Sequence, residues 1–456
     1  MKTIYKLSFL ALVMSCSSPT ENKESDKAVR LITVDPGHFH AALVQKSMYA
    51  NVDSVVHVYA PEGTDVGFHL KRIDGFNTRA ENPTHWKEEV YYGDDFFEEM
   101  INQKAGNVVV LSGNNKKKTE YISKSLQAGF NVLADKPMII KAEDFEVLKS
   151  AFETAKQNNL LLYDIMTERF EITTMLQKEF SMLPDVFGVL QEGTPDNPSV
   201  TKESVHHFYK YVSGSILTRP AWFMDVAQQG EGIVDVTTHL VDLVQWECFP
   251  EQVLDYSHDI ELINAKRTIT EMTLSEFKAI TKLDAFPDYL KENVVNDTVL
   301  KIYSNGEINY KLKNVHAKVS VIWNYKAPEG AGDTHYSIMR GTKANLIIKQ
   351  GAEQQYKPVL YFEPLANDAQ FETALMEKLK TVQTKYSGVE LKKLETGWEV
   401  IVPDSYKEGH EAHFGRVMEK FLEYLNNHTI PDWEVPNMLA KYYTTTKALE
   451  LAKQKK

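Results

Sequence analysis

Residues 107–134 read NVVVLSGNNKKKTEYISKSLQAGFNVLA, and this stretch decides the fold. The apolar run at 107–112 predicts a strand, the segment 117–128 predicts a helix, and the run at 131–134 predicts a second strand. Gly129 suits the end of the helix, where a residue in the left-handed conformation is favoured. Because a helix joins the two strands directly, the stretch predicts a parallel pair with a crossover helix.

The same alternation continues on both sides of this unit. We expect strands at 29–34, 54–59 and 160–163, and a helix at 142–157. Strands and helices that alternate at this spacing predict a Rossmann-like, doubly wound parallel α/β sheet over residues 29–168. In such a sheet, ligands bind beyond the carboxyl ends of the strands.

The end of the first strand is where a dinucleotide would lie, with its pyrophosphate at a helix N-terminus. Residues 35–40 read DPGHFH and retain only Gly37 of the Gly-x-Gly-x-x-Gly fingerprint, with Asp35 and His40 in place of the first and third glycines. An ordinary strand-to-helix turn explains this segment equally well. Glu62 lies two residues beyond the usual place of the acid that binds the ribose, so the sequence does not choose between NAD and NADP.

Two later segments resemble a known family. Residues 128–138, AGFNVLADKPM, resemble the Glu-Lys-Pro signature of the Gfo/Idh/MocA oxidoreductases, with Asp135 in place of the glutamate. Residues 230–242, GEGIVDVTTHLVD, are similar to the family's Asp-x-x-x-His helix. Segments 323–335 and 339–344 resemble an oxidoreductase C-terminal domain. Two motifs in the family's order are more specific than either alone, and they imply an NAD-dependent enzyme.

The resemblance also implies which residues act. It places Lys136, Asp235 and His239 in the chemistry. Together with the strand-end rule, it gives the expected cofactor contacts, which are Asp35, Gly37, His38, Phe39, His40, Glu62, Ser112, Asn114, Asn115, Asp135, Lys136 and Pro137.

Residues 232–247 indicate a site independently of the resemblance. The segment is mostly apolar, but Asp235, His239 and Asp242 recur at spacings that form one stripe on a helix. An ionisable stripe on a buried helix costs free energy unless it is paired or used. A simple Asp–His hydrogen bond in the core is the alternative, and Lys136 at the sheet edge favours a site. Asp242 is expected either to hold His239 or to bind backbone.

Hydride transfer from a secondary alcohol explains this set of residues. It needs a base for the hydroxyl proton, a group that stabilises the alkoxide, and a nicotinamide. Histidine suits the base because its ordinary pKa lies near neutral pH. We therefore assign His239 as the acid/base, Lys136 as the alkoxide stabiliser, and Asp235 as the orienting group and substrate ligand.

The substrate contacts are expected between the two motifs. Residues 205–211 alternate like a strand, with His206, Phe208 and Lys210 on one face and His207, Tyr209 and Tyr211 on the other. An aromatic ring beside charged groups suits a sugar, although an ordinary strand explains the run equally well. The expected substrate contacts are Lys210, Arg219, Trp222, Asp235 and His239.

The remaining histidines give no site from the sequence. His38 and His40 form a His-x-His pair, but the sequence offers no third ligand nearby, so we expect no metal. His335, His410 and His413 are too scattered to assign.

Residues 169–456 predict a substrate-binding α+β domain with a large, mainly antiparallel sheet. Strands are expected at 299–304, 308–312, 316–324 and 344–349, with turns at Ser304-Asn-Gly306 and Pro328–Gly332, and C-terminal helices at 366–384, 411–426 and 436–453. In the resembling family, the open face of such a sheet often makes oligomer contacts, so a homo-oligomer is an open expectation.

The composition is that of a globular protein. Hydrophobic residues make up 43% and charged residues 25% of 456, which excludes a disordered chain. The formal charge of −12 argues against binding to nucleic acid or directly to an anionic membrane. The two cysteines, Cys16 and Cys248, allow at most one disulfide bridge.

The N-terminus predicts export. Residues 1–16 are a basic start and a short apolar run, and a membrane span needs roughly 20 residues. Residues 13–16, VMSC, resemble a bacterial lipobox, which is cleaved before a cysteine that then carries lipid; a buried N-terminal strand or helix is the alternative. Residues 17–28 are then a polar tether. We expect an exported lipoprotein, periplasmic or associated with the outer membrane, that contacts the membrane only through lipid on Cys16.

The leading hypothesis is an NAD-dependent oxidoreductase, with NADP not excluded, that acts on a secondary hydroxyl of a sugar or glycoside and forms, for example, a 3-keto sugar. Outside the cytoplasm, the nicotinamide would have to be retained and recycled. One alternative is an NAD-dependent glycosidase that oxidises C3 transiently so that the glycosidic bond is eliminated. Another is a non-catalytic sugar-binding lipoprotein on a degenerate Rossmann fold. The damaged fingerprint supports this last alternative, and the intact Lys136, Asp235 and His239 oppose it.

Overall fold

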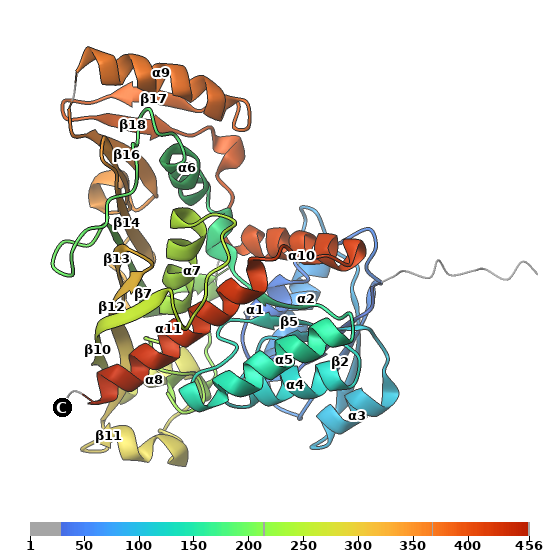
Figure 1. Cartoon of the computed structure of the whole chain (residues 1–456). Helices are drawn as coiled ribbons and strands as arrows, with labels where there is room; N and C mark the ends of the chain where they lie inside the picture. The colour runs from blue at the N-terminus through green and yellow to red at the C-terminus, as the bar shows by residue number, and fades with distance from the viewer. Residues whose placement is uncertain (1–28, 213–214, 367, 455–456) are drawn as a thin grey trace, which may run out of the picture.

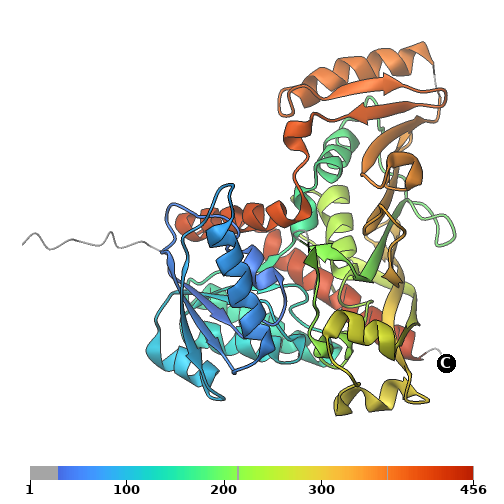
Figure 2. The same cartoon turned by 180° about the vertical axis from the view of Figure 1, so that it is seen from behind.

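The computed structural model describes residues 29–212, 215–366 and 368–454, so the predicted signal peptide, the tether and Cys16 lie outside the described residues. Figures 1 and 2 show two bodies, a parallel sheet in blue and teal and a taller sheet in green to orange. Of the C-terminal helices, α10 (His410–Asn427) returns to the first body, and α11 (Glu434–Gln454) packs against both bodies, with β10 (Ile260–Thr273) and α7 (Thr237–Cys248) of the second among its neighbours.

The first body is a six-stranded sheet in the order β3-β2-β1-β4-β5-β6, with every neighbouring pair parallel. This confirms the predicted doubly wound α/β fold. Its strands are β1 (Leu31–Val34), β2 (Val55–Ala60), β3 (Lys87–Tyr92), β4 (Val108–Leu111), β5 (Asn131–Asp135) and β6 (Leu162–Ile165). Its helices are α1 (His40–Leu43), α2 (Thr64–Thr78), α3 (Phe96–Gln103), α4 (Lys118–Gln127) and α5 (Phe145–Gln157).

The valine-rich runs become the central strands because both faces of the sheet are covered. All four residues of β1 and all four of β4 are buried, as near-continuous apolar strands between helix layers should be. Helix α1 has only four residues, so the first turn does not lead into a long helix.

The second body is a ten-stranded sheet in the order β10-β12-β13-β7-β14-β15-β16-β18-β17, with β11 paired to β12. Only β7 and β13 pair in parallel, which confirms a mainly antiparallel sheet. The strands are β7 (Val200–Tyr209), β10 (Ile260–Thr273), β11 (Val294–Val295), β12 (Val299–Leu312), β13 (Val315–Lys326), β14 (Thr334–Arg340), β15 (Ala344–Lys349), β16 (Val359–Pro364), β17 (Glu390–Lys393) and β18 (Trp398–Ile401).

One turn prediction in this sheet is wrong. The sequence suggested two strands separated at Ser304-Asn-Gly306, but β12 runs unbroken from Val299 to Leu312. Its side chains alternate between buried and partly exposed along the whole strand, which stabilises the extended form. Gly306 is needed for packing, since a Cβ atom there would lie 2.7 Å from Cα of Ile233.

The remaining helices cover the second sheet or join the two bodies. They are α6 (Ile172–Ser181), α7 (Thr237–Cys248), α8 (Leu274–Thr281) and α9 (Ala369–Gln383), and a small hairpin pairs β8 (Tyr211–Val212) with β9 (Ser215–Ile216). Phe414, Val417 and Phe421 of α10 belong to the same hydrophobic core as the six-stranded sheet. Within the described residues, none of the helices is both long and apolar enough to span a membrane.

Candidate active site

A polar cavity of about 1380 Å³ lies where the carboxyl ends of the parallel strands meet the second sheet. The predicted catalytic residues Lys136, Asp235 and His239 all line it. Lys136 follows β5 directly, and His239 lies in the first turn of α7. Asp235 lies in the turn before α7 rather than on the helix, so the predicted helical stripe is wrong at its first residue.

Two of these three residues form an ion pair. Nζ of Lys136 lies 2.5 Å from Oδ1 of Asp235, and Oδ2 of the same carboxylate accepts a hydrogen bond from Gln229 at 3.1 Å. Both side chains of the pair are less than a tenth exposed. The pair crosses from the first sheet to the second body, which fixes the lysine at the cavity wall.

One ring nitrogen of His239, the buried Nδ1, has no hydrogen-bond partner among the described residues. Burial and the nearby Lys136 lower the pKa of His239 from 6.5 to about 3, so the imidazole is neutral at neutral pH. The imidazole is therefore unprotonated and able to accept a proton, but the lowered pKa makes it a weaker base than the ordinary value near neutral pH on which its assignment rested.

Asp242 does not hold His239, and it does not bind backbone, so both expectations for it are wrong. It lies in an ion network with Arg169 of the 3₁₀ turn η3 (Thr167–Phe170) and with Lys441 of α11. The guanidinium donates at 2.6 and 2.7 Å, and the ammonium donates at 2.9 Å. Burial acts to raise the pKa of Asp242, but Arg169 and Lys441 hold it well below its usual range.

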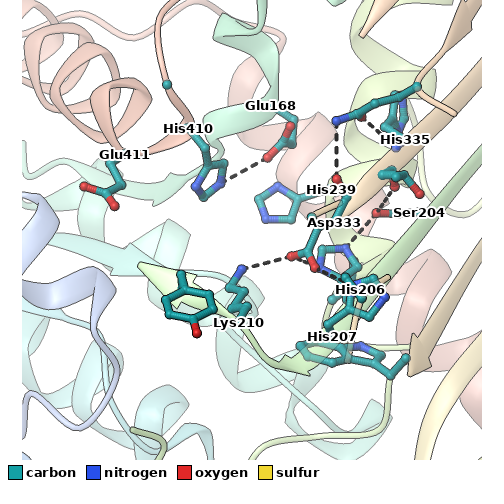
Figure 3. A pocket seen from close by; sticks show the side chains of 18 of the residues that line it. Glu168, Ser204, His206, His207, Lys210, His239, Asp333, His335, His410 and Glu411 are labelled. Carbon is teal, nitrogen blue, oxygen red and sulfur yellow. Dashed lines mark hydrogen bonds and ion pairs between the residues drawn. The ribbon is translucent and has the colours of Figure 1, made fainter. Parts of the chain in front are cut away.

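Eight of the chain's 14 histidines line the cavity, namely His38, His40, His206, His207, His239, His335, His410 and His413. The sequence left His335, His410 and His413 unassigned. Strand β14 brings His335 to the cavity and helix α10 brings His410, although the two are distant along the chain (Figure 3). His413, also on α10, lines the same cavity. His410 Nε2 lies 3.3 Å from Oε1 of Glu168.

Near the residues expected to contact the substrate, ionisable side chains form a cluster that the sequence did not predict. His206, His207 and Lys210 all contact the carboxylate of Asp333, at 3.2, 3.1 and 2.9 Å (Figure 3). The alternation of the strand predicted opposite faces for His206 and His207, and the two imidazoles nevertheless reach different oxygens of this one carboxylate. Asp333 precedes β14, whose Thr334 pairs with Val205 of β7, and from that position its two oxygens reach both imidazoles.

Two expected sugar contacts are already engaged. Arg219 lines the cavity, but its Nε and Nη2 donate to the backbone oxygens of Phe208 and His207. Burial lowers the pKa of Arg219 to about 10. Trp222 does not line the cavity; its Nε1 donates to Oδ2 of Asp65 at 2.7 Å. The tryptophan ring that does line it is that of Trp323.

The turn expected to hold the dinucleotide is filled. A Cβ atom on Gly37 would lie 2.8 Å from Cζ2 of Trp222 and 3.0 Å from Oδ2 of Asp65. A Cβ atom on Gly113 would lie 2.0 Å from the carbonyl oxygen of Asp35, so the first and fourth strand ends pack backbone to backbone. Burial and Asp65 raise the pKa of Asp35 to about 6.

Other residues that were expected to contact the cofactor form hydrogen bonds within the protein instead. Asn114 Nδ2 donates to Gln228, and Asn115 Nδ2 donates to the backbone oxygen of Gln229, both at 2.7 Å. Glu62 is exposed, and Pro137 is buried behind Lys136. With Trp222 and two carboxyl groups at the turn, and only four residues in α1, a dinucleotide does not fit there as the side chains stand.

Ser112, His38, His40 and Asp135 form one cluster, with Phe39 between the two histidines. Oγ of Ser112 donates to Oδ2 of Asp135 at 3.0 Å, and Nδ1 of His40 lies 2.9 Å from the same oxygen. The sequence offered no third group for the His-x-His pair, and that premise is wrong, because β5 ends beside the turn after β1.

Comparisons with known proteins fit this architecture. Residues 37–163 match the family described as "Oxidoreductase family, NAD-binding Rossmann fold", and residues 176–453 match "Putative oxidoreductase C terminal domain". Among curated proteins, none matches the chain. A crystal structure of a protein from Parabacteroides merdae, described as a putative oxidoreductase, is 59% identical, with a TM-score of 0.92 over 94% of this chain and 98% of that one.

More distant structures share the fold. A levoglucosan dehydrogenase in complex with NADH and L-sorbose is 11% identical, with a TM-score of 0.59 over 93% of this chain and 97% of that one. A 3-ketoreductase from Actinomadura kijaniata in complex with NADP is 12% identical, with a TM-score of 0.54 over 92% and 96%. At this identity the likeness extends to the fold alone.

Proposed function

The chain belongs to the Gfo/Idh/MocA oxidoreductase family, and from this premise we propose that it oxidises a secondary hydroxyl of a sugar or glycoside. The observation that carries the proposal is the meeting of Lys136, Asp235 and His239 in one wall of the polar cavity. Proton acceptor, cation and orienting carboxylate come from two bodies of the molecule and converge at the carboxyl edge of the sheet, where ligands of such folds bind.

The roles of these residues follow from their surroundings. His239, neutral and with a free ring nitrogen among the described residues, takes the proton of the hydroxyl. Lys136 stabilises the negative charge that develops on the oxygen. Asp235 positions the ammonium through their 2.5 Å contact and is available to a second substrate hydroxyl.

The family's Rossmann domain is described as NAD-binding, and a nicotinamide dinucleotide, NAD or NADP, would supply the acceptor for the hydride of the alcohol. The filled turn at Gly37 means that Trp222 and Asp65 must leave before such a cofactor binds. The proposal therefore includes a movement of the segment around Trp222.

A carbohydrate is the substrate class that the cavity favours. Its walls carry imidazoles, carboxylates and amines for hydroxyl groups, and Trp323 supplies an aromatic face. The volume of about 1380 Å³ exceeds that of common small-molecule pockets, roughly 300–1,000 Å³, so the cavity has room for a glycoside or disaccharide. Oxidation at C3 would also acidify the C2 proton, which makes glycosidic cleavage the alternative outcome.

The test starts with the purified full chain. Mass spectrometry identifies any bound NAD(H) or NADP(H), and each dinucleotide is then supplied with a panel of glycosides while reduced nicotinamide is followed by absorbance. An accumulating keto sugar supports the oxidoreductase, and a released aglycone supports the glycosidase. If neither dinucleotide binds and no sugar reduces it, the proposal fails.

The filled turn favours a second candidate, a carbohydrate-binding protein without redox chemistry. Binding of glycosides measured by calorimetry, with no turnover in the presence of either dinucleotide, would select it. The matched variants Lys136→Met and His239→Gln would then alter affinity and have no rate to alter.

We further propose that the protein is an exported lipoprotein, which residues 1–16 and the VMSC string support. Expression in a Gram-negative host should place the chain in the membrane fraction, with lipid on Cys16 detected by mass spectrometry. Cys16→Ser should release the chain from that fraction. A wild-type chain recovered entirely without lipid would contradict the proposal.

A further inference from the structure

We infer that His38, His40 and Asp135 bind a divalent transition-metal ion. Nδ1 of His40 lies 2.9 Å, and Nδ1 of His38 lies 3.6 Å, from Oδ2 of Asp135. The three ligand atoms lie within 4.8 Å of one another. Metal–ligand bonds of about 2.0–2.2 Å place neighbouring ligand atoms roughly 3–3.5 Å apart, so small side-chain shifts suffice to close the site.

The carboxylate of Asp135 is held in place by hydrogen bonds but does not use all of its hydrogen-bonding capacity within the described residues. Oγ of Ser112 donates to its Oδ2 at 3.0 Å, and Nζ of Lys118 donates to its backbone oxygen at 2.8 Å. Its buried Oδ1 has no hydrogen-bond partner within the described residues, although the residue is only 3% exposed. A cation bound at Oδ2, the oxygen near both imidazoles, would offset the charge of this buried carboxylate, which otherwise costs free energy.

Both imidazoles present Nδ1 near the same oxygen of Asp135, and these are the nitrogens that would bind the ion. Neutral imidazole is the ligating form of histidine.

The positive charges that face the site are engaged elsewhere. Lys136 pairs with Asp235 at 2.5 Å, and Arg219 donates to two backbone carbonyls. A carboxylate therefore offsets the charge of Lys136, whereas Arg219 and Lys118, which donates to the backbone oxygen of Asp135, keep their charges near the site. The ion would meet one carboxylate and two imidazoles. The remaining backbone contact to Nδ1 of His38, from N of His40, is long at 3.4 Å.

The arrangement leaves room for a substrate or water on the ion. His38 and His40 line the cavity, whereas Asp135 lies behind them. Three protein ligands with one open position are typical of catalytic zinc, and two imidazoles with one carboxylate suit the divalent ions from iron to zinc. The inference does not rest on the proposed oxidation, because metal binding is measured without substrate or dinucleotide.

The test uses the untagged full chain, since a polyhistidine tag would bind the same metals. The chain is stripped with a chelator and titrated with Co²⁺ and Zn²⁺ alone, by visible absorption and by calorimetry. We expect about one ion per chain, with cobalt absorption bands that report imidazole and carboxylate ligands.

Variants locate the ion. His40→Gln and Asp135→Asn should weaken binding by about 10–100-fold or more, as ligand and supporting-group losses do. His258→Gln is the matched control, because this exposed imidazole also contacts a carboxylate, that of Asp255, at 2.9 Å. His410→Gln tests whether the ion lies across the cavity near Glu168 instead.

Circular dichroism and thermal midpoints check that each variant folds, and His38→Gln replaces any that does not, since its side chain is more exposed. Equal affinity in the wild type and in every folded ligand variant would overturn the inference. So would a wild-type chain that takes up neither ion, in which case Asp135 only orients His40. A failed sugar oxidation with intact metal binding would overturn the proposed function and leave the metal site standing.

Discussion

Helix α7 carries two ionisable side chains three positions apart that meet opposite surroundings. Asp242 accepts two bonds from Arg169 and one from Lys441, so its charge is matched on every side. His239 lines the cavity with an unpartnered ring nitrogen. The difference separates a structural polar residue from a functional one, because a saturated group stabilises the fold and an unsatisfied one is available to a ligand.

The saturated side is a network that joins both bodies. Lys441 also lies 2.6 Å from Asp164 at the end of β6, and Arg169 also donates to Glu434 at 3.1 Å. All of these side chains are less than a tenth exposed. The network ties α7 and α11 to the parallel sheet, directly behind the wall that carries His239.

The largest effect should come from breaking the network. Arg169→Met leaves Asp242 and Glu434 as buried carboxylates without their guanidinium, and we expect the free energy of unfolding to fall by about 3–5 kcal/mol. Urea unfolding measures it. Lys149→Met in the exposed pair with Glu146 is the control and should leave the urea midpoint unchanged. A loss no greater than that of the control would refute the structural role.

Replacing the residues that line the cavity should change activity rather than stability. His239→Gln removes the proposed proton acceptor, and turnover of any glycoside that the panel shows to be a substrate should fall by at least ~10²-fold, with the urea midpoint close to that of the wild type. Lys136→Met should behave alike. If His239→Gln lost as much stability as Arg169→Met and kept its turnover, the two faces of α7 would not differ in the way described.

Much of this contrast could not be predicted from the sequence. Runs such as Val108–Leu111 predict the parallel sheet because the periodicity is local, and Lys136 and His239 lie in short motifs. The partner of Asp242, in contrast, depends on where α11 packs, 199 residues further along the chain. A stripe of spaced residues shows that charges share a helix face and says nothing of what faces them.

The cluster of His38, His40 and Asp135 was not predicted from the sequence, for the same physical reason. His40 and Asp135 are 95 residues apart and meet only because β1, β4 and β5 are neighbours in the sheet. Trp222 was expected beside the substrate because aromatic rings suit sugars, but its indole pairs with Asp65 across 157 residues. Residue type and spacing therefore identified candidate groups, and strand order decided which of them meet.

Lowering the pH should reduce the free energy of unfolding, and His239 should account for part of that loss. Because the pKa of His239 is about 3 when folded and 6.5 ordinarily, the unfolded chain binds its proton first as the pH falls. The stabilisation present above pH 6.5 is therefore lost progressively towards pH 3, and His239 alone accounts for about 2 kcal/mol between pH 7 and pH 5.

His239→Gln should reduce the fall in unfolding free energy between these two pH values by that amount. His258→Gln, at an exposed histidine, is the control and should leave it unchanged. An identical pH dependence in wild type and His239→Gln would mean that His239 does not stay neutral in the folded protein.

The smallest expected effect concerns Trp222, which fills the turn at Gly37 where the sequence predicts a dinucleotide. Its hydrogen bond to the carboxylate of Asp65 is of the kind that contributes about 1.5–3 kcal/mol, so removing it should make the open form of the turn at least ~10-fold more accessible. Trp222→Ala should therefore bind NAD(H) or NADP(H) about tenfold more tightly by calorimetry. Trp246→Ala is the control, since that ring packs on Lys178 away from the turn.

A gain in Trp222→Ala alone would mean that one ring holds the cofactor site closed and that the oxidoreductase works through an opened turn. No gain would leave Asp35 and Asp65 as the obstacle, because two carboxyl groups at Gly37 oppose the charge of a pyrophosphate whether or not the ring is present. The double replacement Asp35→Asn with Asp65→Asn then decides. If dinucleotide binding is still absent, the cavity with its histidines and Lys136 acts without a nicotinamide, and the carbohydrate-binding candidate replaces the oxidoreductase.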